Sequence, residues 1–158
     1  MATATKKRIN KVQQFTAPYG NKFSQSFRYE TNASGVFVDS SQATAVQVND
    51  IARLGILPAG LELQDALAIV SDAFAATTTA DIGFLYVDGV DSSVVPQNAA
   101  YFFSALNTAA TGRTRATAVN APVRLPKDAY LVLTRKGAAD SAVGIADVIV
   151  EGILQGPM

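Results

Sequence analysis

The chain has 158 residues with 13 basic and 13 acidic side chains, no His, no Cys and no Trp, and 49% of its residues are apolar. This length suffices for one domain that buries a core without disulfides or metal ions. The missing His and Cys remove the commonest general base, the commonest metal ligand, thiolate nucleophiles and zinc clusters, so the composition argues against an enzyme.

No apolar run approaches the roughly 20 residues of a membrane span, and the first ten residues are polar and basic. The sequence therefore predicts a soluble protein made in a cytoplasm, without a membrane partner. Only 16% of residues are charged, against roughly 25% in a typical domain. A surface with so few charges suits a protein that contacts other proteins over much of its surface.

The charges are unevenly distributed along the chain. The first 29 residues carry six basic side chains and no acid, whereas the other 129 carry 7 basic and 13 acidic ones, so the two parts are +6 and −6. We interpret residues 1–19 as an extended basic N-terminal arm and residues 20–158 as a single domain. Aromatic residues among the cations favour an arm that docks on an acidic surface, and a solvated tail is the alternative. The side chains of interest in this arm are Lys6, Lys7, Arg8, Lys11, Phe15, Tyr19 and Phe23.

Short strands separated by turns are predicted along the first half of the domain. Residues 22–30 form the first strand, with Phe23, Phe27 and Tyr29 on one face. Strands are also expected over 35–39 and 43–51, and over an apolar run at 54–57 that ends in the turn at 58–60. Residues 61–70 favour a strand with Leu61, Leu63, Leu67 and Ile69 on one face, although a helix also fits their spacing.

The second half continues the same pattern. Residues 75–80 form a loop, 81–87 are the clearest strand in the chain, and Asp88-Gly89 is a hairpin signal. Residues 99–106 fit either a helical turn or a strand. Strands follow over 119–125, where Pro122 indicates an edge, over 129–135, and over 143–154 with bends or bulges at Gly144 and Gly152. Eight or nine strands predict an all-β sandwich or barrel.

No group of residues has the spacing of a catalytic, cofactor or metal site. Asp81, Asp88 and Asp91 could pair as carboxylates or hold a hard cation, but they lack the spacing of a calcium loop, and an Asp beside Gly is typical of turns. Arg113 and Arg115 could hold an acidic partner, or they could be solvated in an exposed loop. We therefore predict no catalytic residue, no cofactor and no metal.

Several segments, taken in order, resemble those of a known family. They are Leu57-Pro58-Ala59-Gly60 after an alternating strand, the strand end Ile69-Val70-Ser71, the strand and turn from Asp81 to Gly89, Tyr101-Phe102-Phe103, and Tyr130 to Thr134 followed by Gly137-Ala138-Ala139. Together they resemble small virion proteins of tailed bacteriophages. The most similar of these are capsid decoration, or cement, proteins with a jelly-roll-like antiparallel β-sandwich.

The resemblance implies a structural protein of the capsid surface, made in the host cytoplasm, that clamps neighbouring subunits of the major capsid protein. It also implies a homo-oligomer, with a homotrimer favoured over a homodimer, and the basic arm would then be the capsid-binding element. Nucleic acid is not the expected partner. Two alternatives remain: a small jelly-roll coat protein whose basic arm contacts packaged nucleic acid, and a carbohydrate-binding or adhesion sandwich of the virion.

Overall fold

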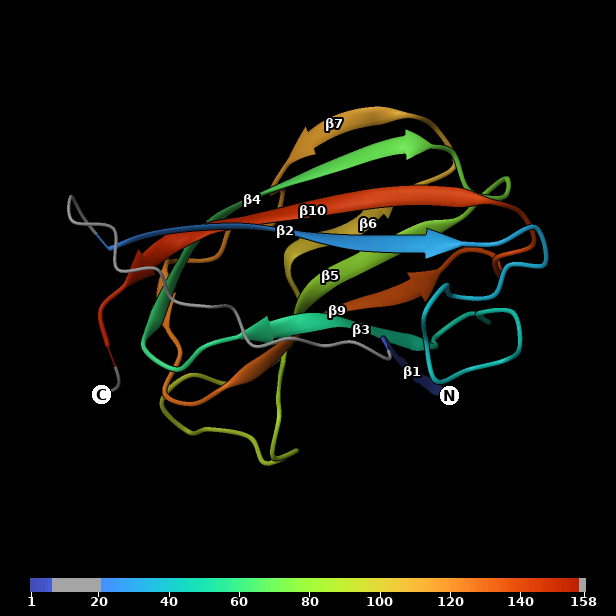
Figure 1. Ribbon diagram of the computed structural model, residues 1–158. Helices are drawn as coiled ribbons and strands as arrows, with labels where there is room; N and C mark the ends of the chain where they lie inside the picture. Colours follow the sequence, from blue (N-terminus) through green and yellow to red (C-terminus); the bar gives the residue numbers. More distant parts are fainter. Residues whose placement is uncertain (7–20, 157–158) are drawn as a thin grey trace.

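A computed structural model describes residues 1–6 and 21–156, and this part of the chain contains ten strands and no helix (Figure 1). The strands are β1 (Thr3–Thr5), β2 (Lys22–Thr31), β3 (Ile51–Leu57), β4 (Leu61–Asp72), β5 (Thr79–Tyr86), β6 (Asn98–Asn107), β7 (Gly112–Arg115), β8 (Val123–Arg124), β9 (Ala129–Lys136) and β10 (Gly144–Leu154).

The strands build two sheets that lie face to face (Figure 1). One sheet has the order β1-β3-β9-β5-β6, and the other has the order β2-β10-β4-β7 with β8 also paired to β4. All ladders are antiparallel except that between β1 and β3. From β2 onward the chain passes to the other sheet at every connection except β5–β6 and β7–β8. The predicted all-β sandwich is confirmed.

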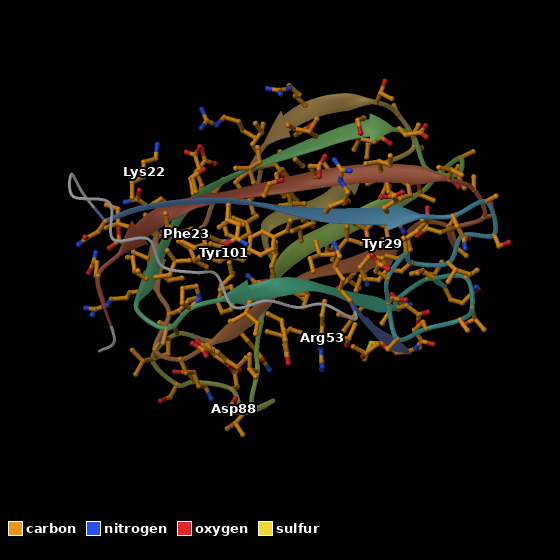
Figure 2. The ribbon with its side chains drawn as sticks, viewed as in Figure 1. Lys22, Phe23, Tyr29, Arg53, Asp88 and Tyr101 are labelled. Carbon is orange, nitrogen blue, oxygen red and sulfur yellow. The ribbon has the colours of Figure 1, made fainter. Side chains whose placement is uncertain are left out.

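The core lies between the sheets and is rich in aromatic side chains. Phe23, Phe27 and Tyr29 of β2 all point into it, as the period-2 pattern of this strand predicts. Two ring clusters lie apart along the sandwich, one around Tyr29 and one around Tyr101 (Figure 2). Such a core binds the two sheets together without disulfides or metal ions.

The predicted strands over 35–39 and 43–51 are wrong. This segment makes only single bridges, Lys6 with Ser40, Thr31 with Phe37 and Val36 with Ala45, and a regular ladder starts at Ile51. The backbone turns to positive φ at three of its residues, 72° at Gly35, 56° at Asp39 and 70° at Asn49, which breaks an extended strand. The segment is therefore a long loop from β2 to β3.

Residues 61–70 form a strand, so the helix alternative is wrong, and so is the predicted face of this strand. Leu61 and Leu63 are buried, but Leu67 and Ile69 lie on the outer face of the sheet. The cause is a bulge at Gln64, because Leu63 pairs with Gly152 whereas Asp65 pairs with Glu151. One extra residue in a strand moves every later side chain to the opposite face.

The last strand shows register shifts near its two glycines, where bends or bulges were expected, but the extra residues, Gln64 and Ser71, lie in β4. Its register with β4 shifts between Ile145 and Ala146 and again between Glu151 and Gly152. A Cβ atom at Gly152 would lie 2.2 Å from the carbonyl oxygen of Glu62, so the close approach of the two backbones requires glycine. Of the two options for residues 99–106 the strand is correct, whereas the predicted strand over 119–125 shrinks to β8.

Candidate assembly surface

Most of the predicted arm lies outside the described residues. Lys7, Arg8, Lys11, Phe15 and Tyr19 fall in residues 7–20, so their contacts stay a prediction. Phe23, in contrast, is a core residue only 7% exposed, and its ring therefore cannot act as an anchor for a partner. The expectation for Phe23 is corrected for a simple reason: it alternates with Ser24 on β2 and faces the opposite sheet.

The first six residues lie on the edge of the chain's own sheet. Strand β1 pairs in parallel with the start of β3, and the backbone N–H of Lys6 donates to the carbonyl oxygen of Arg53 at 3.4 Å. On its other side, the N–H of Ser41 donates to the carbonyl oxygen of Thr5 at 2.7 Å. The sequence analysis missed this strand, although the alternation Ala2-Thr3-Ala4-Thr5, with Ala4 buried, is a strand signal.

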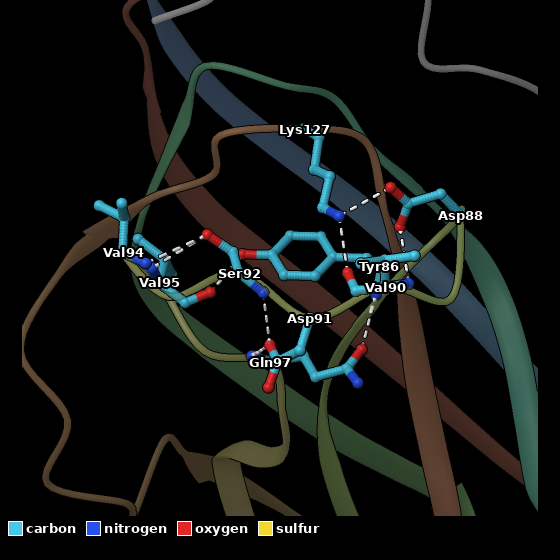
Figure 3. Close-up of polar contacts among 9 residues, drawn as sticks. All are labelled: Tyr86, Asp88, Val90, Asp91, Ser92, Val94, Val95, Gln97 and Lys127. Carbon is cyan, nitrogen blue, oxygen red and sulfur yellow. Dashed lines mark hydrogen bonds and ion pairs between the residues drawn. The ribbon is translucent and has the colours of Figure 1, made fainter.

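The connection from β5 to β6, residues 87–97, projects from the sandwich and is held by a lysine from the neighbouring turn (Figures 1 and 3). Lys127 Nζ donates to Asp88 Oδ2 at 2.7 Å and to the carbonyl oxygen of Val90 at 2.6 Å, and it lies 4.6 Å from the centre of the Tyr86 ring. The hydrogen bond from Lys127 is the main reason that the pKa of Asp88 lies below its usual value.

A second set of hydrogen bonds fixes the rest of this loop (Figure 3). Asp91 Oδ1 accepts the backbone N–H of Ser92 at 2.8 Å and that of Gln97 at 2.7 Å. The Tyr86 hydroxyl donates to the carbonyl oxygen of Val95 at 2.5 Å, and burial raises the pKa of this phenol. The Asp88-Gly89 turn exists, with φ of 71° at Gly89, but it opens this longer connection and is not a two-residue hairpin.

This rigid loop carries apolar side chains into solvent beside a small hollow. Val90 is 62% exposed and Val94 75% exposed. The hollow has a volume of about 220 Å³. Its lining comes from β5, β6, β8 and two loops and consists of Phe84, Val94, Val95, Pro96, Asn98, Tyr101, Asn120, Ala121 and Val123. No charged residue lines the hollow, and polar and apolar atoms contribute about equally to its exposed lining.

The acidic residues singled out in the sequence serve turns and backbone groups. Asp88 and Asp91 stabilise the loop, and Asp81 Oδ1 accepts the backbone N–H of Ala105 at 2.8 Å. Over residues 1–6 and 21–156, no group of three or more acidic side chains could hold a metal ion. The structure therefore favours the turn interpretation for these residues.

Arg113 and Arg115 lie on the exposed edge strand β7, not in a loop. Arg115 Nη2 lies 2.8 Å from Asp65 Oδ2 and 4.0 Å from Glu151 Oε2, so it forms ion pairs across the outer face of the sheet. Exposed pairs of this kind contribute little to stability. Charged side chains on a short edge strand also discourage pairing with other strands.

A buried charged cluster at another part of the sandwich escaped the sequence analysis. The guanidinium of Arg135 is fully buried and donates from Nε to Asp140 Oδ2 at 3.1 Å and from Nη1 to Thr108 Oγ1 at 2.8 Å. The Tyr29 hydroxyl donates to the same carboxylate oxygen at 2.5 Å. Burial is the largest influence on the pKa of Asp140 and raises it, while the charge of Arg135 opposes that rise.

The position of this cluster indicates a structural role. The backbone N–H of Asp140 donates to Val46, and that of Arg135 donates to Asp50, so the cluster fastens the long loop between β2 and β3. A signal for it existed in the sequence, because Arg135 follows Leu131 and Leu133 at period 2 on an inward face.

The chain is similar to known proteins in its structure and not in its sequence. No protein family model matches the chain, and no curated protein matches its sequence. A chain in the capsid of Ralstonia phage GP4 is similar over 99% of this chain and 100% of its own length, with a TM-score of 0.64 and 17% identity. A chain in the capsid asymmetric unit of Cyanophage Pam1 is similar over 92% of this chain and 96% of its own, with a TM-score of 0.59 and 18% identity.

These likenesses show that the chain shares its fold with chains of phage capsids. Within the described residues no helix is long and apolar enough to cross a membrane.

Proposed function

We propose that the protein is a non-enzymatic structural component of a bacteriophage virion, and specifically a decoration, or cement, protein. It binds the outer surface of the capsid and clamps neighbouring major capsid subunits. The observation that carries this proposal is the likeness in fold to a chain of the GP4 capsid, which covers 99% of this chain and 100% of that one.

The strand order supports the jelly-roll part of the proposal. Without β1 and β8, each sheet has four strands, in the orders β2-β10-β4-β7 and β3-β9-β5-β6. The first and last of the eight strands are neighbours in one sheet, and the second and seventh are neighbours in the other. We infer a jelly roll, because such nested pairing of eight antiparallel strands in two sheets is the arrangement of that architecture.

The charge distribution supports a clamping arm. Residues 7–20 carry three basic side chains and no acid, and the domain that follows residue 29 has a net charge of −6. A cement protein stabilises a capsid by binding the assembled lattice and not the free coat subunits. The proposed capsid contacts are Lys6, Lys7, Arg8, Lys11, Phe15 and Tyr19. We also propose a homotrimer, with a homodimer as the second choice.

Cryo-electron microscopy of capsids mixed with the purified full chain tests this proposal. Density for the chain outside a shell made by a different, larger protein is the expected result. If the chain forms the shell itself with its N-terminal residues inward, it is a coat protein whose arm meets nucleic acid. If it associates with no particle, both the decoration hypothesis and the coat hypothesis are wrong, and a carbohydrate-binding or adhesion protein becomes the remaining alternative.

Charge reversals separate the contribution of the arm from that of the domain. We expect the variant Lys7→Glu/Arg8→Glu/Lys11→Glu to bind capsids at least about tenfold more weakly, because three attractive charges become repulsive, and the binding of the unaltered chain to weaken with added salt. Arg113→Glu, on exposed β7, is the matched control and should bind like the unaltered chain. Equal binding by all three proteins would contradict the proposed role of the arm.

A further inference from the structure

The most protruding apolar side chain in the described part of the chain lies directly beside the hollow. Val119 is fully exposed, and the next two residues, Asn120 and Ala121, line the hollow. Across the hollow, Val94 is 75% exposed on the β5–β6 loop. The surface thus presents an exposed apolar side chain next to a hollow that has no charged lining residue.

Both sides of the hollow are held in place before any partner arrives. Asn120 Nδ2 donates to the carbonyl oxygen of Tyr101 at 2.7 Å, and the Tyr101 hydroxyl donates to the carbonyl oxygen of Ala121 at 2.8 Å. The backbone N–H groups of Thr117 and Ala118 donate to the carbonyl oxygen of Phe102 at 3.1 and 3.2 Å. The opposite wall is the loop fixed by Lys127 and Asp91 (Figure 3). A preorganised surface loses little conformational freedom on binding.

The size and chemistry of the hollow restrict what can fill it. A volume of about 220 Å³ lies below the range of roughly 300–1,000 Å³ typical of small-molecule sites, and suits a single inserted side chain. The absence of charged lining residues and the rings of Phe84 and Tyr101 favour an uncharged side chain.

We propose that this surface is a contact between copies of the chain, in which Val119 of one copy enters the hollow of the next copy. Because Val119 and the hollow belong to the same chain, the same contact can repeat from copy to copy, and it closes a ring of subunits when the rotation between copies closes. The charged pair that holds the β5–β6 loop, Lys127 with Asp88, is satisfied within each copy. The inference rests on the homo-oligomer of the proposed function and does not depend on capsid binding.

The contact is small, so it is weak in free solution and effective where copies are crowded. Its apolar part is centred on two exposed valines and one side-chain-sized cavity, well under the roughly 800 Å² per partner of a stable complex. We therefore expect association of the full chain to depend on concentration over a range of about 10 μM to 1 mM.

Sedimentation velocity over this range tests the contact. Val119→Asp should lower the association constant at least about tenfold, because a central apolar anchor is replaced by a charge. Val143→Asp is the matched control, since Val143 is exposed on the turn before β10 and away from the hollow, and its association should stay within about twofold of the unaltered chain. Equal losses in the two variants, or an unaltered chain that stays monomeric throughout, would overturn the proposal.

Disulfide trapping gives a second, independent measurement, because the chain has no cysteine of its own. A mixture of Val119→Cys and Val94→Cys chains should form linked pairs of the two chains under mild oxidation. Val119→Cys mixed with Val143→Cys should form clearly fewer. Equal yields in the two mixtures would count against the contact.

The outcomes also separate this inference from the proposed function. If Val119→Asp associates like the unaltered chain and both bind capsids, the inference fails and the proposed function stands. If the tenfold loss occurs and no form of the chain binds capsids, the contact between copies stands and the cement role fails.

Discussion

The substitution Asp140→Asn should destabilise the fold strongly, because it leaves the guanidinium of Arg135 buried without a neutralising charge. Arg135 is fully buried and Asp140 is 2% exposed, so water cannot replace the lost carboxylate. Breaking a buried ion pair by removing one partner costs about 3–5 kcal/mol. For a domain of this size each kcal/mol lowers Tm by about 2–4 °C, which predicts a fall of about 6–20 °C.

The double variant Arg135→Met/Asp140→Asn shows whether the cost comes from the charge left behind. Replacing both members of a buried pair by uncharged groups is often neutral, so we expect the double variant to regain most of the lost stability. Neither Asp140 Oδ1 nor Arg135 Nη2 has a hydrogen-bond partner among the described residues, although Nη2 lies 3.0 Å from Asp140 Oδ2. The native cluster is therefore incompletely satisfied, and besides the ion pair the double variant loses the two hydrogen bonds that Arg135 Nη1 donates to Thr108 Oγ1 and to the carbonyl oxygen of Thr79.

Urea denaturation and calorimetry at pH 7 measure both variants. The exposed pair of Arg28 and Asp147, with hydrogen bonds of 2.9 and 3.1 Å, provides a control of the same chemistry. Asp147→Asn should cost less than about 1 kcal/mol, since water solvates the arginine that remains. If Asp140→Asn costs no more than Asp147→Asn, or if the double variant is as unstable as the single one, the reasoning from burial is wrong.

Two further predictions concern the β5–β6 region. A Cβ atom at Gly83 would lie 2.0 Å from the carbonyl oxygen of Asn98. Gly83→Ala should therefore destabilise the protein by about 1–3 kcal/mol or more in urea denaturation. Gly112 has open space around it, so the control Gly112→Ala should change stability by less than about 0.5 kcal/mol. Equal effects of the two substitutions would contradict the close approach. The pKa of Asp88, followed by NMR, should rise toward its ordinary value of 3.8 in Lys127→Met. Because this pKa is lowered in the folded state, the contribution of the pair to stability is present above pH 3.8 and is lost as the pH falls through the lowered value. An unchanged pKa of Asp88 in Lys127→Met would refute the assignment of the shift to Lys127.

The strands that the sequence predicted well are those whose alternation faces one core. In β2 the inward positions are Phe23, Phe27 and Tyr29, so a period of two was visible without any knowledge of the partner strands. In β9 the signal was a run of consecutive apolar residues, and residues 131–135 are all buried. The face of β4 was not visible, because the bulge at Gln64 arises from its pairing with β10, some 85 residues away in the chain.

The candidate surface was less accessible to sequence reasoning than the fold. The turn at Asp88-Gly89 was predictable from local turn chemistry, but the hollow combines the segments 84–101 and 120–123, which only the sheets bring together. Single valines such as Val94 and Val119 are unremarkable in a sequence. Whether such a valine can take part in a contact depends on its exposure, on the rigidity of its neighbours and on a cavity beside it. These features arise from the folded structure and leave no periodic pattern in the sequence.

The position of β10 has a consequence for how the chain folds during synthesis. This strand lies between β2 and β4, so residues 144–154 separate two strands that emerge from the ribosome much earlier. Until it arrives, β2 has no neighbouring strand in its sheet, and β4 lacks its neighbour on one side. Folding that waits for distant pairings is slow, so we expect the nascent chain to gain its protection from proteolysis late and nearly all at once.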